Sequence, residues 1–129
     1  MTATPGVDTI SGALRELEQA FPAAVTHEPD GAGGVYATVA GCWLGNHWSQ
    51  PVVDLSFHIP FNYPWAAIYP YYLPGDTWPT AVVSPALQRI SWRGQQVIQV
   101  SLRHNQWNPQ IDTAVGCVRQ VLAWARNLR

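Results

Sequence analysis

The feature that most constrains the fold is an alternation of apolar and polar residues over residues 52–59, near the middle of the chain. Every second side chain in this run is apolar, namely Val53, Leu55, Phe57 and Ile59. This alternation is typical of a strand with one buried face. Two other runs of strand-forming residues precede it, at 24–27 and 35–40, and only short loops connect the three. Because a parallel pair needs a crossover of a dozen or more residues, the sequence predicts an antiparallel meander.

Helical periodicity predicts one helix before these strands and one at the end of the chain. Residues 8–20 carry apolar side chains at helical spacing, with Asp8 as the cap and Pro22 as the stop signal. Residues 112–127 carry a broader apolar stripe of the same period. Each stripe is wide enough to pack against a sheet.

The stretch after the third strand is less regular. A fourth strand is expected at 67–73, where Pro70 indicates a sheet edge or a bulge. Residues 74–109 have poor periodicity apart from a short strand-like run at 96–100, and a segment this long without clear elements is usually functional. The predicted order is an N-terminal helix, a four-stranded antiparallel meander, a long irregular segment and a C-terminal helix, which defines an α+β fold.

Composition describes a compact chain without an electrostatic surface for nucleic acid or membranes. Hydrophobic residues make up 47% of the 129 residues and charged residues 12%, which excludes disorder because ample apolar surface can be buried. The net charge is −1, so neither nucleic acid nor an anionic membrane is expected as a partner. No apolar run reaches the roughly 18 residues of a membrane span, and the first residues lack a signal-peptide pattern. We expect one cytoplasmic domain over residues 1–129, with residues 1–7 flexible.

Two motifs give the chain a family resemblance. Residues 59–64 read Ile-Pro-Phe-Asn-Tyr-Pro and, with Pro70, are similar to a Pro-x-x-Tyr-Pro loop. Residues 106–109 read Gln-Trp-Asn-Pro and are similar to a Trp-Ser-Pro motif, with the last helix beginning shortly afterwards. In order and spacing these motifs resemble the ubiquitin-conjugating (UBC) fold. Residues 102–112 also resemble a bacterial branch of conjugating-enzyme-like proteins, found with ubiquitin-like proteins, activating enzymes and isopeptidases in operons linked to phage defence.

The resemblance implies a UBC-like domain over nearly the whole chain. Such a protein accepts a ubiquitin-like protein from an adenylating (activating) enzyme and transfers it to a protein target. These three proteins are therefore the expected partners. No cofactor is implied, since the activating enzyme consumes the ATP and this chain has no phosphate-binding glycine loop.

The chain departs from the family at the catalytic position. When Trp107 is placed on the family's tryptophan, the catalytic cysteine falls at or near Gln99, and no His-Pro-Asn precedes it. Ser101 is our candidate for an oxyester nucleophile, with His104 as general base and Arg103 contacting the oxyanion or the incoming carboxyl terminus. Four further residues are expected to shape the site: Tyr63, Gln99, Asn105 and Trp107.

Ordinary structural roles remain open for these residues. Ser101 can simply end a strand, and His104 can hydrogen-bond in a turn. Cys117 is expected in the core of the last helix, whereas Cys42, at a strand end, is an alternative nucleophile if its thiol is exposed. The four histidines show no metal-ligand spacing, and no metal site is expected.

Two functions other than conjugation are also compatible with the sequence. A UBC-fold adaptor without catalytic activity would bind a ubiquitin-like protein or an activating enzyme non-covalently, and the vacant cysteine position favours it. An unrelated α+β protein that binds a small molecule would have a deep apolar pocket between helix and sheet. All seven basic residues are arginine, and a lysine-free chain suits a carrier of reactive esters, although arginine-rich codon usage explains it equally.

Overall fold

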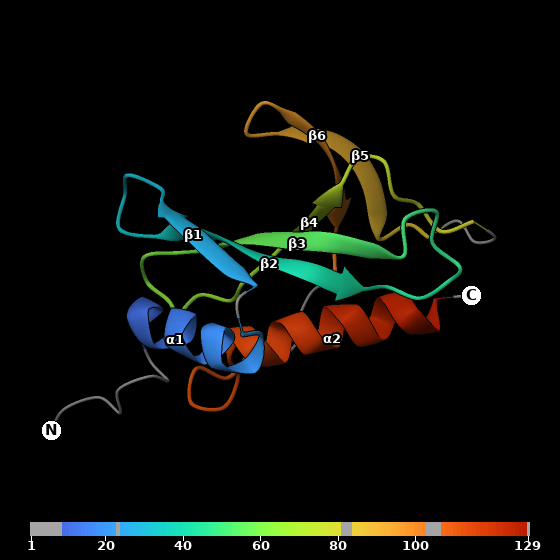
Figure 1. The fold of residues 1–129 in the computed structure, drawn as a ribbon. Coiled ribbons are helices and arrows are strands. Elements are labelled where there is room, and N and C mark those ends of the chain that lie inside the picture. The colour runs from blue at the N-terminus through green and yellow to red at the C-terminus, as the bar shows by residue number, and fades with distance from the viewer. Residues whose placement is uncertain (1–8, 23, 81–83, 103–106, 129) are drawn as a thin grey trace, which may run out of the picture.

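The computed structural model describes residues 9–22, 24–80, 84–102 and 107–128. The chain forms two layers, an antiparallel six-stranded sheet and two helices that lie against one face of it (Figure 1). The strand order is β1-β2-β3-β4-β6-β5. In chain order the elements are α1 (Ile10–Ala20), β1 (Val25–Pro29), β2 (Val35–Trp43), β3 (Val52–Ile59), β4 (Tyr71–Pro74), β5 (Leu87–Trp92), β6 (Gln95–Val100) and α2 (Ala114–Asn127).

The α+β class is confirmed, but the prediction of four strands is wrong. The first four strands are sequential neighbours, as a meander requires, and two more lie within the segment that was expected to be irregular, one of them over the strand-like run at 96–100. These are β5 and β6, joined by a tight turn at Arg93 and Gly94, whose φ angles are both positive (53° and 79°). Such a turn normally carries Asn-Gly or Asp-Gly, so Arg-Gly is a weak signal for a hairpin.

Both helices begin at a threonine cap. The Thr9 hydroxyl accepts a hydrogen bond from the backbone N–H of Gly12 (2.9 Å), which makes Thr9, and not the expected Asp8, the N-cap of α1. Thr113 caps α2 in the same way through the N–H of Gly116 (3.1 Å). Each cap satisfies one of the N–H groups that a helix start leaves unpaired.

The core lies between the sheet and the two helices. The alternating run forms β3 as predicted, and its four apolar side chains are all buried. The predicted stripe of the last helix faces them from α2 through Val118, Val121, Leu122 and Ala125, with Cys117 buried beside it. Ile111, the first residue of the predicted stripe, lies before the helix and is 73% exposed. Within the described ranges, neither helix has the length and apolar content needed to cross a bilayer.

The loop between β2 and β3 fixes the C-terminal end of α2. The indole Nε1 of Trp48 donates to the carbonyl of Ala125 (3.0 Å), and His47 donates to the same carbonyl through Nε2 (2.9 Å). In return, Nε of Arg126 donates to the carbonyl of Trp43 (3.0 Å). The N–H of Leu128 reaches the same Ala125 carbonyl only at 3.4 Å, so the bonds from the loop add to a long cap contact and tie α2 to the sheet.

Replacing the buried indole is therefore expected to destabilise the fold. Trp48→Phe removes the hydrogen bond to Ala125 and leaves unfilled volume around a side chain that is 2% exposed. We expect the free energy of unfolding, measured in urea, to fall by about 1–3 kcal/mol.

Trp65→Phe is the matched control, because Trp65 is 74% exposed. It should change the free energy of unfolding by less than about 0.5 kcal/mol. Equal losses in the two variants would contradict the anchoring role of Trp48.

Candidate functional site

Ser101 and Gln99 lie at the end of β6, on the face of the sheet that the helices leave uncovered. The N–H of Ser101 donates to the carbonyl of Ala86 (2.8 Å) and so extends the β5–β6 ladder by one residue. Ile98 and Val100 point into the core. Because side chains alternate along a strand, those of Gln99 and Ser101 point to the opposite, uncovered face of the sheet. Their side chains are in contact, since Nε2 of Gln99 donates to Oγ of Ser101 (3.3 Å).

Tyr63 and Trp107 form a second group, on the helix side of the sheet. Nε1 of Trp107 donates to the carbonyl of Pro64 (2.6 Å), and the rings of Tyr63 and Trp107 lie 6.2 Å apart. Tyr63 belongs to the core, and burial raises the pKa of Tyr63 to about 12. The predicted site residues are thus divided between the two faces of the sheet. Arg103, His104 and Asn105 lie outside the described residues.

Neither cysteine offers an accessible thiol. Cys117 is in the core, as expected. Cys42 does not meet the condition set for the alternative nucleophile, because it is 5% exposed and its Sγ donates to the carbonyl of Val39 (3.3 Å). Burial raises the pKa of the Cys42 thiol, and burial also raises the pKa of the Cys117 thiol. Because the thiolate is the nucleophile, both cysteines are unsuited to accept an acyl group.

A cluster of aromatic rings and one guanidinium occupies the uncovered face. Trp92 stacks on Tyr72 with their ring centroids 3.9 Å apart, and Tyr36 meets the Trp92 ring edge-on. The guanidinium of Arg93 lies 3.8 Å from the centre of the Tyr36 ring and forms an ion pair with Glu28. We call these five residues the open-face cluster. It joins the β5–β6 hairpin to β1, although β1 and β5 are opposite edges of the sheet.

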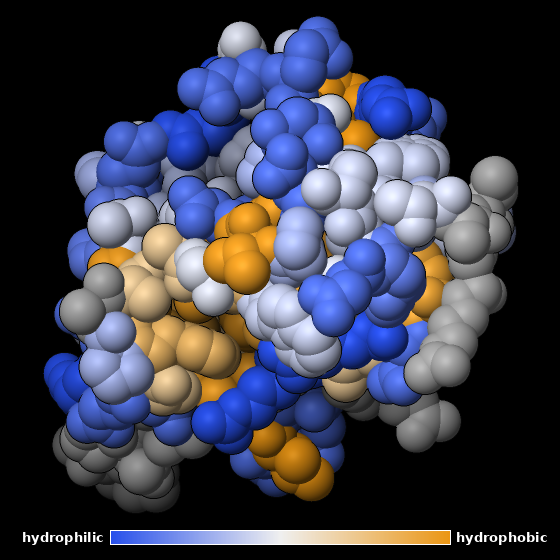
Figure 2. All heavy atoms as spheres, turned by 45° about the vertical axis from the view of Figure 1, so that its right-hand side comes forward, coloured by the Kyte–Doolittle hydropathy of each residue, from blue (hydrophilic) through white to orange (hydrophobic). Residues whose placement is uncertain are grey.

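The hairpin consequently rises out of the plane of the other strands (Figure 1) and bounds a groove of about 720 Å³. Its lining combines polar and apolar side chains, and two of the polar residues, Thr38 and Ser56, are hydrogen-bonded to each other (2.9 Å). The groove lies on the face of the sheet away from the helices. An unrelated small-molecule binder was expected to have a different cavity, a deep apolar pocket between helix and sheet. On the side of the molecule that Figure 2 shows, hydrophobic residues lie in separate patches surrounded by hydrophilic residues.

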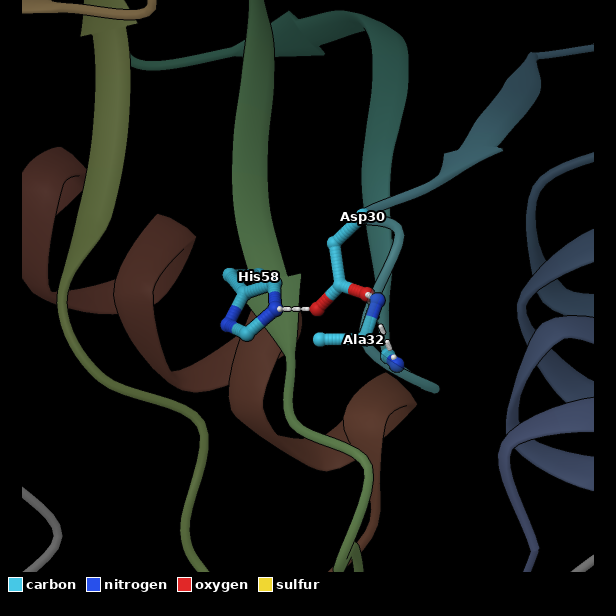
Figure 3. Close-up of polar contacts among 4 residues, drawn as sticks. Asp30, Ala32 and His58 are labelled. Atoms are coloured by element: carbon cyan, nitrogen blue, oxygen red, sulfur yellow. Dashed lines mark hydrogen bonds and ion pairs between the residues drawn. The ribbon is translucent and has the colours of Figure 1, made fainter.

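A histidine–aspartate pair lies on β3 and the β1–β2 loop. Nε2 of His58 lies 2.6 Å from Oδ2 of Asp30, whose other oxygen accepts the N–H groups of Ala32 (2.7 Å) and Gly34 (2.9 Å) (Figure 3). A Cβ at Gly34 would lie 2.6 Å from Oδ2 of Asp30, so glycine permits this close approach. The strand alternation places His58 on the outer face, but the sequence pattern contains no signal for its pairing with Asp30.

Chemically, the described residues offer a partly buried serine hydroxyl, an imidazole oriented by a carboxylate, and a groove with polar and apolar lining. They contain no cluster of three metal-ligating side chains. Comparisons of the chain with protein-family models, with curated proteins and with solved structures find no match.

The two thiols are expected to be protected in the folded protein. At about pH 8, an aromatic disulfide reagent should modify Cys42 and Cys117 only as fast as the protein unfolds, and both should react at once in urea. Ser91→Cys is the matched control, because residue 91 is exposed on β5 and its thiol should react rapidly in the native state. Fast native modification of the unaltered chain would contradict the burial of both thiols.

Asp30 should contribute a pH-dependent part of the stability. The hydrogen bond from His58, followed by that from Ala32, holds the pKa of Asp30 below its ordinary value of 3.8. A lowered carboxyl pKa stabilises the fold above the unfolded pKa, and this contribution is lost as the pH falls through the folded pKa. Asp30→Asn should therefore lower the melting temperature near neutral pH, and the difference should shrink below pH 3.8.

Asp76→Asn removes an exposed carboxylate outside this loop and serves as the control. Its difference from the unaltered protein should not follow the same pH dependence. A difference for Asp30→Asn that stays constant from neutral to acidic pH would argue against the stabilising pair.

Proposed function

We propose that this chain is a UBC-like protein that accepts a ubiquitin-like protein from an activating enzyme and passes it to a protein target, in a bacterial modification system of the type linked to phage defence. Support comes from the order of α1, four sequential antiparallel strands and α2, together with the Tyr-Pro loop and Trp107 motifs. The hydrogen bond between Trp107 and Pro64 joins these two motifs in space.

The nucleophile we propose is Ser101, and the observation that carries this assignment is its contact with Gln99. Since the Gln99 amide donates to Oγ, the hydroxyl acts as acceptor there and its own proton remains available to a base. Oγ attacks the carboxyl carbon of the ubiquitin-like protein while the bond to the activating enzyme's thiolate breaks. The serine proton passes to a general base, the role proposed for His104, and the product is an oxyester.

A non-covalent adaptor is the second candidate. Both thiols are buried, which removes the usual thioester chemistry, and the groove on the uncovered face offers a surface for a protein segment. An adaptor of this kind binds the ubiquitin-like protein or its activating enzyme without forming a covalent bond.

Intact-mass measurement distinguishes the two candidates. The chain is incubated with an activating enzyme, its ubiquitin-like protein and ATP, and then treated with thiol and afterwards with mild alkali. We expect an adduct that survives thiol, is released by alkali and is absent in Ser101→Ala. An oxyester is predicted to behave in this way, whereas a thioester is cleaved by thiol.

Ser91→Ala is the control, because it removes another hydroxyl of the β5–β6 hairpin and should leave the adduct unchanged. An adduct released by thiol would contradict the assignment of Ser101. If no adduct forms although the activating enzyme is shown to be charged, the adaptor function is supported instead.

A further inference from the structure

The groove on the uncovered face carries an excess of carboxylates. Asp54 lines it from β3, and Asp76 lines it from the chain just after β4. Among the described residues of the lining, the one cationic side chain is Arg93, which already pairs with Glu28. Among the described lining residues, the two aspartates therefore have no cation of their own, which favours an occupant that is positively charged.

The groove also lies where the pairing of β3 with β4 ends. These strands pair at Ser56–Tyr72 and Phe57–Tyr71, whereas Leu73 and Pro74 pair with β6. Asp54 and Ser56 therefore line one side of the groove, and Leu73, Pro74 and Gly75 line the other. A groove between two strands fits an extended chain better than a compact ligand.

Tyr72 provides an independent indication of a ligand. Its side chain is nine-tenths buried, with 9% exposed, yet it lines the groove beside Trp92. Within the described part of the chain, its hydroxyl has no hydrogen-bond partner. A phenol hydroxyl without a partner in the lining of a groove can both donate to and accept from an occupant.

We propose that this groove binds an extended, basic peptide segment of a partner protein. Guanidinium or ammonium groups of the segment pair with Asp54 and Asp76, and its backbone amides bond to the polar side chains of the lining: Thr38, Ser56, Tyr72, Gln95 and Gln96. This peptide site rests on the proposed function in one respect, namely that the partner is a protein. It requires neither the activating enzyme nor the chemistry of Ser101.

The test uses the full chain and a fluorescein-labelled hexapeptide that alternates arginine and valine. Fluorescence anisotropy should show saturable binding that weakens with added salt, because the paired groups are partly exposed. In amide-resolved NMR spectra the same peptide, without its label, should shift the signals of residues that line the groove, such as Asp54, Gly75 and Gln96. The signals of α2, on the opposite face, should stay in place.

Neutralising the carboxylates separates specific pairing from general attraction. Asp54→Asn and Asp76→Asn should each weaken binding about two- to fivefold, as expected for partly exposed ion pairs. The asparagine oxygen at residue 54 can still accept the N–H of Gly41, so the fold should be retained. Glu18→Gln removes an exposed negative charge on α1, away from the groove, and should leave the affinity unchanged.

Several results would overturn the proposal. These are the absence of binding at millimolar peptide, equal binding of a hexapeptide with glutamate in place of arginine, or unchanged affinity in the two asparagine variants. Amide shifts confined to residues outside the groove would also overturn it. Ser101→Ala should bind the peptide as the unaltered chain does, so failure of the oxyester chemistry and failure of the peptide site can be told apart.

Discussion

The shape of the uncovered face depends on the position of Arg93 between two aromatic rings. Its guanidinium lies over Tyr36 and also within 5.5 Å of the Trp92 ring centre, so it connects a central strand to the tip of the β5–β6 hairpin. The ion pair with Glu28 involves two half-exposed side chains and contributes at most about 1 kcal/mol. The cation–π contacts, together with the stacking of Trp92 on Tyr72, contribute as much or more. The pairing of β6 with β4 joins the hairpin to the sheet. On the uncovered face, the aromatic contacts hold the tip of the hairpin against β2 and β4 at least as strongly as the ion pair holds it against β1.

The two faces of the sheet have different roles as a consequence of strand alternation. On one face, apolar residues of β3 pack under α2, whose C-terminal end is held by Trp48 and His47. The other face carries the hydroxyl, amide and carboxylate groups on which both proposals rest. Substitutions at Ser101 or Asp76 therefore address function with little effect on the core, whereas a substitution at Trp48 addresses stability.

Sequence patterns predicted the parts of the fold that depend on local periodicity. The alternation at 52–59 and the stripe at 112–127 correspond to β3 and α2, since each pattern records which face is buried. The β5 strand was missed because it is an edge strand with exposed polar residues, and its position depends on contacts of Arg93 and Trp92 with distant strands. The contact of Gln99 with Ser101 follows from their spacing on a strand, but the groove and the Asp30–His58 pair arise only from tertiary structure.

Amide hydrogen exchange in Arg93→Gln tests most directly whether this side chain holds the uncovered face together. The substitution removes the charge and the cation–π contacts while Gly94 remains at the turn. We expect faster exchange in β5, β6 and β1, with unchanged protection in β3 and α2, because Arg93 and its aromatic contacts lie on the face of the sheet away from the core. Unchanged exchange in the hairpin, or equal acceleration throughout the sheet, would contradict the account.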